Sequence, residues 1–149
     1  KLAEVKKASA KDVRDEWAAT PAADQRAAIE EAAKSAPEAQ VLEAEIARAA
    51  ELSKAGDDEA AFRHLERAHV LGQTSTYYHT RVHVLMLKHG IKTRDIQETA
   101  GQVLRIAGAA TKTPLGIYPK GNTGGANVSP IKPMPVPEDL AEILREAGR

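Results

Sequence analysis

The chain of 149 residues is 42% hydrophobic but only 3% aromatic, which predicts one moderate core packed mainly by Ala, Leu, Val and Ile. Basic and acidic side chains both number 21, and this balance argues against a nucleic-acid binder, which needs clustered surplus positive charge. Because there is no cysteine, disulfides and thiolate metal sites are excluded, and no apolar run approaches the roughly 18 residues of a membrane helix. We expect a cytoplasmic protein without direct membrane insertion.

Helix start and stop signals divide the chain into a series of helices. They are predicted near residues 10–19, 21–34, 37–55, 57–71, 75–89 and 93–107. Asp57 and Thr93 are predicted N-caps. Glycines that should end helices in the left-handed conformation are Gly56, Gly72, Gly90 and Gly108. No segment alternates with period two for long enough to be a strand, so the predicted fold is all-α.

The spacing of two of these glycines suggests a repeat. Gly56 and Gly90 are 34 residues apart, which is the tetratricopeptide period, and residues 50–72 resemble one such unit, with a poorer copy at 84–108. We therefore predict tetratricopeptide-like antiparallel helical hairpins. The side chains expected to fill the space between the helices are Leu65, Val82, Leu85, Ile96, Val103 and Leu104.

The C-terminal part of the chain has a different composition. Residues 111–137 hold six of the eight prolines and the sequence GNTGG, so an extended Pro/Gly-rich tail is predicted, followed by a short amphipathic helix. Its apolar side chains are too frequent for a solvated linker, and we expect partner contacts from Tyr118, Ile131, Met134 and Val136. The predicted divisions are an N-terminal helical extension (1–40), a helical-hairpin core (41–110) and the tail with its short helix (111–149).

Histidines gather on two consecutive predicted helices. His79 and His83 are one turn apart, while Glu66 and His69 share a face of the preceding helix. If the helices pack antiparallel, these four side chains converge as nitrogen and oxygen donors that suit iron, zinc, nickel or copper. The alternatives are a polar ligand groove and a hydrogen-bonded core network, in which the predicted partners of the histidines are Gln73, Gln102 and Arg105.

Four motifs carry a family resemblance. They are LERAHVLGQ at 65–73, HTRVH at 79–83, GQVLRI at 101–106 and PKGNTGGANVSPIKPMPVPEDL at 119–140. In this order they are similar to a family of small bacterial proteins of unknown function, over roughly residues 41 to 145. The resemblance implies no established reaction, and residues 1–40 would extend beyond the family's usual extent.

Two functions follow from these patterns. We favour a non-catalytic interaction protein, an accessory or scaffold subunit that binds another protein through its hairpins, N-terminal helices and apolar tail and that is compatible with homo-oligomers. The alternative is a small transition-metal-binding protein that uses the cluster of histidines and Glu66. Enzymatic activity is not favoured, because the residues between His79 and His83 lack the glutamate of a zincin motif and no nucleophile signature accompanies them.

Overall fold

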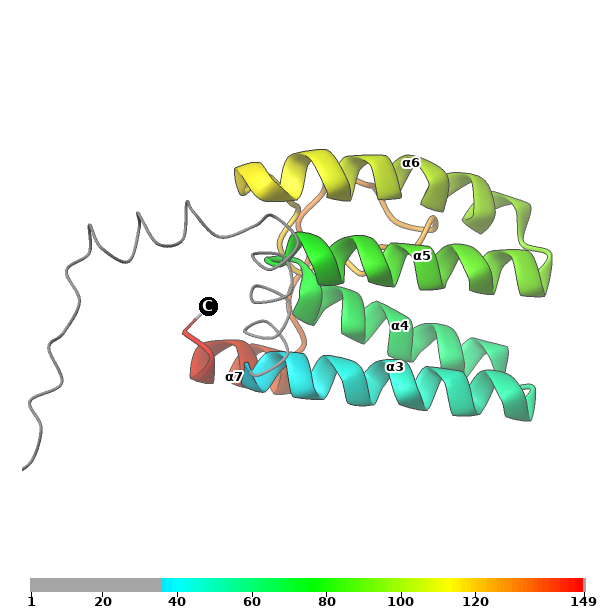
Figure 1. Cartoon of the computed structure of the whole chain (residues 1–149), viewed down its shortest axis with the longest axis horizontal. Helices are drawn as coiled ribbons and strands as arrows, with labels where there is room; N and C mark the ends of the chain where they lie inside the picture. Colours follow the sequence, from blue (N-terminus) through cyan, green and yellow to red (C-terminus); the bar gives the residue numbers. More distant parts are fainter. Residues whose placement is uncertain (1–35, 149) are drawn as a thin grey trace, which may run out of the picture. The chain divides into compact units, whose positions relative to one another are not determined.

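The computed structural model describes residues 36–148, which form helices without any strand (Figure 1). The all-α prediction is confirmed for these residues, and the helices predicted at 10–19 and 21–34 lie outside them. The five helices, packed as antiparallel hairpins, are α3 (Pro37–Ala55), α4 (Asp58–Gly72), α5 (Thr76–Thr93), α6 (Ile96–Lys112) and α7 (Glu138–Glu146), with a 3₁₀ turn, η1 (Thr113–Leu115), after α6. Among them no helix is long and apolar enough to cross a membrane.

Local signals set the first two helices as predicted. Pro37 begins α3 at a position where its missing N–H costs nothing. Gly56 ends α3 with φ 86°, a left-handed conformation that glycine adopts cheaply. Asp57 then caps α4 by accepting a hydrogen bond from the Ala60 N–H at 3.0 Å. The predicted division of the chain at residue 40 lies inside α3.

The other three glycines do not end helices in the predicted way. Gly90 lies inside α5, which continues to Thr93, and Arg94 takes the left-handed conformation with φ 60°. Asp95, not Thr93, caps α6. Gly72 is the last residue of α4 without a positive φ, and Gly108 is helical.

Close packing explains two of these glycines. A Cβ at Gly90 would lie 3.0 Å from Thr99 Oγ1 on α6, and a Cβ at Gly72 would lie 3.0 Å from both Leu42 Cδ1 and Tyr78 Cβ. Both distances are shorter than most contacts that Cβ atoms make, so the neighbouring atoms would have to move by a few tenths of an ångström. Glycine at these positions therefore lets neighbouring helices approach closely, and neither residue adopts the left-handed conformation of the predicted helix stop.

The core lies between α3, α4 and α5. Leu65 and Val82 are buried as predicted. The fully buried large apolar side chains are Leu42, Leu71, Val82, Met86 and Leu140. The prediction that α6 contributes its apolar residues to this core is wrong, because their exposed fractions are 83% for Ile96, 57% for Val103 and 77% for Leu104. The inward face of α6 instead carries Glu98 and Gln102.

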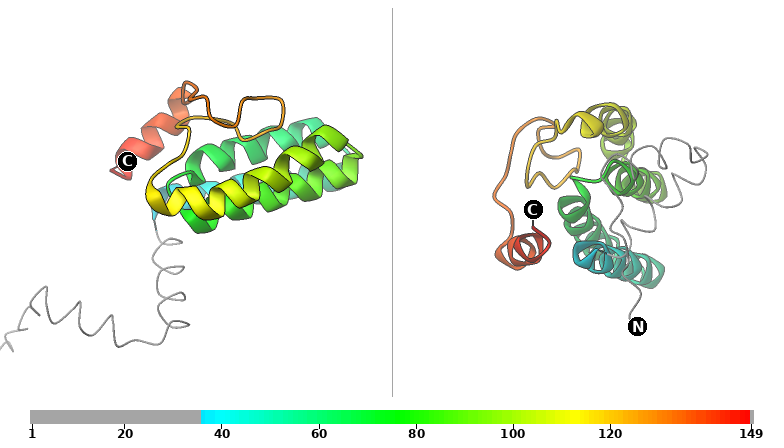
Figure 2. Two further views of the ribbon diagram at one scale, coloured as in Figure 1. Left: turned by 90° about the horizontal axis from the view of Figure 1, so that it is seen from above. Right: turned by 60° about the vertical axis from the view of Figure 1, so that its left-hand side comes forward.

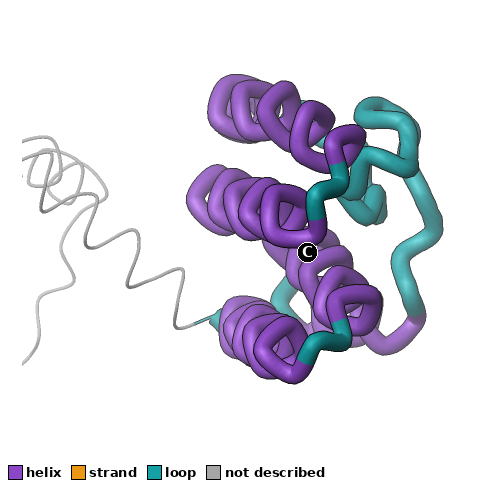
Figure 3. Tube along the Cα trace, turned by 90° about the vertical axis from the view of Figure 1, so that its right-hand side faces the viewer, coloured by secondary structure: helices purple, strands orange, loops and turns teal. Residues whose placement is uncertain are grey.

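A long loop, residues 116–137, contains no helix or strand and crosses one face of the helices before it reaches α7 (Figures 2 and 3). Asn122, which is 1% exposed, organises it. Its Nδ2 donates to the carbonyls of Ser129 and Lys132, both at 2.8 Å, and its Oδ1 accepts from the Gly124 N–H at 2.9 Å. One amide thus fixes three points of the loop.

The short helix α7 closes the fold against α3 and α4. Leu140 is fully buried, and Arg67 on α4 joins Glu45 on α3 at 2.7 Å to Asp139 on α7 at 2.6 Å. The predicted closing helix is therefore anchored by one apolar contact and one ion-pair chain.

Replacing Asn122 tests the loop's dependence on one side chain. We expect Asn122→Ala to lower the free energy of unfolding by about 2 kcal/mol or more, because two carbonyls and one N–H lose their partner. The measurement is urea unfolding followed by circular dichroism. Asn127→Ala, at an exposed position of the same loop, is the control and should change stability by less than about 0.5 kcal/mol.

Candidate metal centre

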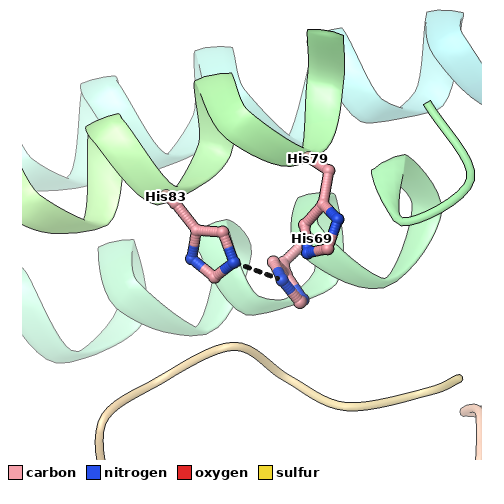
Figure 4. A group of neighbouring side chains, drawn as sticks. All are labelled: His69, His79 and His83. Atoms are coloured by element: carbon pink, nitrogen blue, oxygen red, sulfur yellow. Dashed lines mark hydrogen bonds between the residues drawn. The ribbon is translucent and has the colours of Figure 1, made fainter. Parts of the chain in front are cut away.

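Three of the predicted ligands meet between α4 and α5 (Figure 4). His69 comes from the last turn of α4, and His79 and His83 lie one turn apart on α5. Their exposed fractions are 1%, 5% and 3%. Ring centroids are 4.5 Å apart for His69 and His83, 4.8 Å for His69 and His79, and 5.0 Å for His79 and His83. One nitrogen from each ring lies within 4.8 Å of the others, which makes the three side chains a group that could hold a metal ion.

Each imidazole is held from outside through its Nδ1 atom. The partner is the Asn122 carbonyl oxygen for His69 at 2.8 Å, Thr113 Oγ1 for His79 at 2.7 Å and Gln102 Oε1 for His83 at 2.7 Å. Histidines that bind metals are usually oriented in this way, by a hydrogen bond from the nitrogen that does not bind. The arrangement leaves Nε2 of each ring as the atom that could coordinate a metal ion.

The orientation of Gln102 determines which nitrogen of His83 carries a proton. The Gln102 amide nitrogen donates to Glu98 Oε1 at 2.6 Å and to the Gly124 carbonyl at 2.8 Å, so its oxygen faces His83. Glu98 is fixed in turn by the Ala126 N–H at 2.7 Å. An amide oxygen only accepts hydrogen bonds, and His83 Nδ1 must therefore be the protonated nitrogen.

The same argument holds for His69, whose Nδ1 also faces an acceptor that has no proton to give. The two Nε2 atoms lie 3.1 Å apart in a buried site, a hydrogen-bond distance that Figure 4 marks with a dashed line. In the neutral state, however, both Nε2 atoms carry lone pairs and neither carries the proton that such a bond needs. Two facing lone pairs repel, so a proton or a metal cation is needed between them. Nitrogen ligands at about 2.0–2.1 Å from one tetrahedral zinc ion lie about 3.3–3.4 Å from each other, which is close to this separation.

The electrostatics of the site favour neutral imidazoles. Burial lowers the pKa of His69 well below its ordinary value, and repulsion from the other two rings lowers that pKa further. Burial lowers the pKa of His79 to about 4, and burial together with His79 lowers the pKa of His83 to about 3. A proton is therefore a poor occupant of the space between the rings near pH 7, whereas neutral imidazole is the form that binds metals.

The remaining predicted site residues lie around the triad. Gln73 holds the loop, because its amide donates to the Pro119 carbonyl at 2.9 Å and accepts from the Gly121 N–H at 2.8 Å. Arg105 Nη2 donates to two further loop carbonyls. Glu66 is not part of the group of close donor atoms but lies beside Gly125, where burial raises its pKa.

The apolar loop residues predicted to contact a partner also contact their own chain. Tyr118 and Ile131 line a cavity of about 410 Å³ whose walls include the triad. Met134 and Val136 are half-buried, and the Met134 N–H donates to the Lys120 carbonyl at 3.0 Å. Their role in binding a partner stays a prediction.

Sequence reasoning missed two residues of the site. Thr113 follows α6 without any local signal that it would meet His79, 34 residues earlier in the chain. Asn122 lies in the GNTGG sequence of the predicted extended tail, and its backbone oxygen orients His69. A main-chain contact of this kind does not depend on the residue type, so the sequence carries no signal for it.

Fold and site together define a small all-α protein with a buried three-histidine cluster at the wall of a cavity. The chain belongs to the family described as "Protein of unknown function (DUF3703)", whose model matches residues 36–144. The resemblance inferred from the motifs is confirmed, and the match begins a few residues earlier than expected. No curated protein and no solved structure matches the chain.

The lowered pKa values predict how stability depends on pH. As the pH falls below 6.5, the histidines of the unfolded chain become protonated. In the folded protein, His79 becomes protonated only near pH 4 and His83 only near pH 3. The histidine contribution to the free energy of unfolding therefore decreases from pH 6.5 to 4 and is level above 6.5. Between pH 6.5 and 4, the free energy of unfolding should therefore fall by about 3 kcal/mol less in His83→Gln than in wild type.

Urea unfolding of the metal-free protein at several pH values, in the presence of chelator, measures this effect. The comparison of wild type with His83→Gln cancels the titration of carboxylates that both share. Equal slopes in the two proteins between pH 6.5 and 4 would contradict the assignment of a lowered pKa to His83.

Proposed function

We propose that this protein binds one divalent transition-metal ion through His69, His79 and His83. The observation that carries the proposal is the pair of Nε2 atoms 3.1 Å apart, each with its proton placed on the opposite nitrogen by a fixed acceptor. A hydrogen-bonded core network accounts for the partners of the Nδ1 atoms but leaves the Nε2 lone pairs facing each other. A cation shared by the three rings accounts for both observations.

The donor set narrows the class of metal. Three neutral imidazoles suit zinc, copper, nickel and iron, and the group contains no carboxylate of the kind found in iron sites built from two histidines and one acid. Zinc sites that perform chemistry commonly use three protein ligands and take the remaining ligand from a cavity. Among the candidate metals, we therefore rank a zinc-like ion with one exchangeable ligand first and copper or nickel second.

Metal titration tests this function. Chelator-treated protein should bind one Co²⁺ with the visible absorption of a low-coordinate site, and Zn²⁺ should displace it. His69→Gln and His83→Gln should each weaken binding by more than about 100-fold, and Gln102→Leu by about 10–100-fold because the orientation of His83 is lost.

His89→Gln is the matched control, because His89 lies on the same helix, contacts Phe62 and is outside the group of close donors. Its affinity for Co²⁺ should equal that of wild type. Binding that is undiminished in both triad variants, or absent in wild type, would refute the proposal.

A second candidate function is protein binding, which one observation favours. Ile96, Val103 and Leu104 are exposed on α6 and form an apolar surface of the described part of the chain. The tetratricopeptide-like character predicted for the hairpins belongs to this second proposal. Antiparallel hairpins support it, although α5 begins more than 34 residues after α3 and α6 more than 34 after α4.

The first partner to test is a second copy of the chain. Sedimentation velocity should then show a concentration-dependent dimer in wild type and a monomer in Val103→Glu, because a buried unpaired charge disfavours association. Lys54→Glu, at an exposed position of α3, should leave the dimer intact. A wild type that stays monomeric at all concentrations would exclude self-association through α6.

A further inference from the structure

We propose that the cavity beside the histidine triad binds a small organic carboxylate, with its oxygen on the metal, its charge beside Arg105 and its apolar part against Leu104, Ile117 and Ile131. This inference rests on the proposed metal site and adds to it the chemical class of the exchangeable ligand. Three features of the cavity support it, namely its charge, a guanidinium with unused hydrogen-bond donors and its apolar rim.

The cavity is positively charged. Its volume is about 410 Å³, within the range of small-molecule sites, and its walls include Arg105, Lys112 and the three histidines. None of the described residues that line it is Asp or Glu. A divalent ion held by three neutral imidazoles would add to the two basic side chains, so the cavity favours a ligand of negative charge.

Arg105 is held in position by carbonyl groups of the loop. Its Nη2 donates to the carbonyls of Gly125 at 2.9 Å and Val128 at 2.7 Å. Within residues 36–148 its Nε and Nη1 form no hydrogen bond, its Nε is buried, and it has no ion pair. Both oxygens of nearby Glu98 are occupied, one by Gln102 and the other by the Ala126 N–H.

A half-buried guanidinium with fixed geometry and unused donors is a typical anion-binding group. Burial also lowers the pKa of Arg105, which reflects the cost of keeping the charge there. Arg105 and the three histidines line the same cavity. One ligand can therefore face Arg105 and the triad together.

The outer part of the cavity is apolar. Leu104, Ile117 and Ile131 all line it, and their exposed fractions are 77%, 58% and 77%. A bare inorganic anion would leave these side chains in water. An alkyl chain attached to the carboxylate would cover them, and each buried methylene group strengthens binding. The ligand that matches both ends is a short-chain carboxylate rather than phosphate or acetate.

The experiment titrates Co²⁺-loaded protein with hexanoate and follows the visible spectrum of the metal. Hexanoate should bind at least about tenfold more tightly than acetate because of its longer alkyl chain, and the neutral analogue hexanamide should cause no change at the same concentration. Inorganic phosphate serves as the test of a purely anionic site. Phosphate or acetate binding as tightly as hexanoate would overturn the proposal.

Two variants separate the charged and apolar contributions. Arg105→Gln should weaken hexanoate by at least about tenfold while the affinity for Co²⁺ changes by less than about threefold. Because Arg105 also holds the loop, Ile131→Ser provides a second test, and it should reduce the preference for hexanoate over acetate without changing acetate binding. Lys88→Gln, at an exposed position of α5 away from the cavity, should behave as wild type.

Failure of this inference is distinguishable from failure of the metal proposal. If Co²⁺ does not bind in the absence of added ligand, the proposed metal site is wrong. If Co²⁺ binds but hexanoate leaves its spectrum unchanged, or Arg105→Gln and Ile131→Ser both bind hexanoate as wild type does, the metal site stands and the carboxylate site is refuted.

Discussion

The contact between Gln102 and His83 is the constraint on which the rest of the site depends. Gln102 is fully buried on α6, and a buried amide is tolerated only when its donors and acceptor are satisfied. Its nitrogen bonds Glu98 and the loop at Gly124, and its oxygen bonds His83. The position of the loop, the orientation of α6 and the protonation of a histidine are therefore coupled through one side chain.

This coupling explains why α6 carries its apolar residues outward. The spacing of Ile96, Val103 and Leu104 is that of a core-facing stripe, and periodicity alone predicts burial. The opposite face is buried instead because Glu98 and Gln102 find partners on a loop more than twenty residues further along the chain. Hydropathy patterns assume that polar groups prefer water, and they fail where the fold supplies the hydrogen bonds.

Local signals predicted what depends on neighbours in sequence. The bounds of α3, the cap at Asp57 and the pairing of His79 with His83 follow from helix geometry and capping chemistry. Features that depend on distant contacts were not predictable. Gly90 looked like a helix stop and is a contact point for α6, and Thr113 meets His79 only because η1 folds back onto α5.

The network around the triad is complete on its outer side and incomplete at its centre. Every Nδ1 atom has a partner, and those partners are fixed by further hydrogen bonds, as at Gln102. Burying three imidazoles that resist protonation costs stability, and a network that served stability alone would pair the inner nitrogens as well. The unpaired centre is understandable if the fold is built to hold neutral donors around a cation, since preorganised ligands lose little freedom on binding.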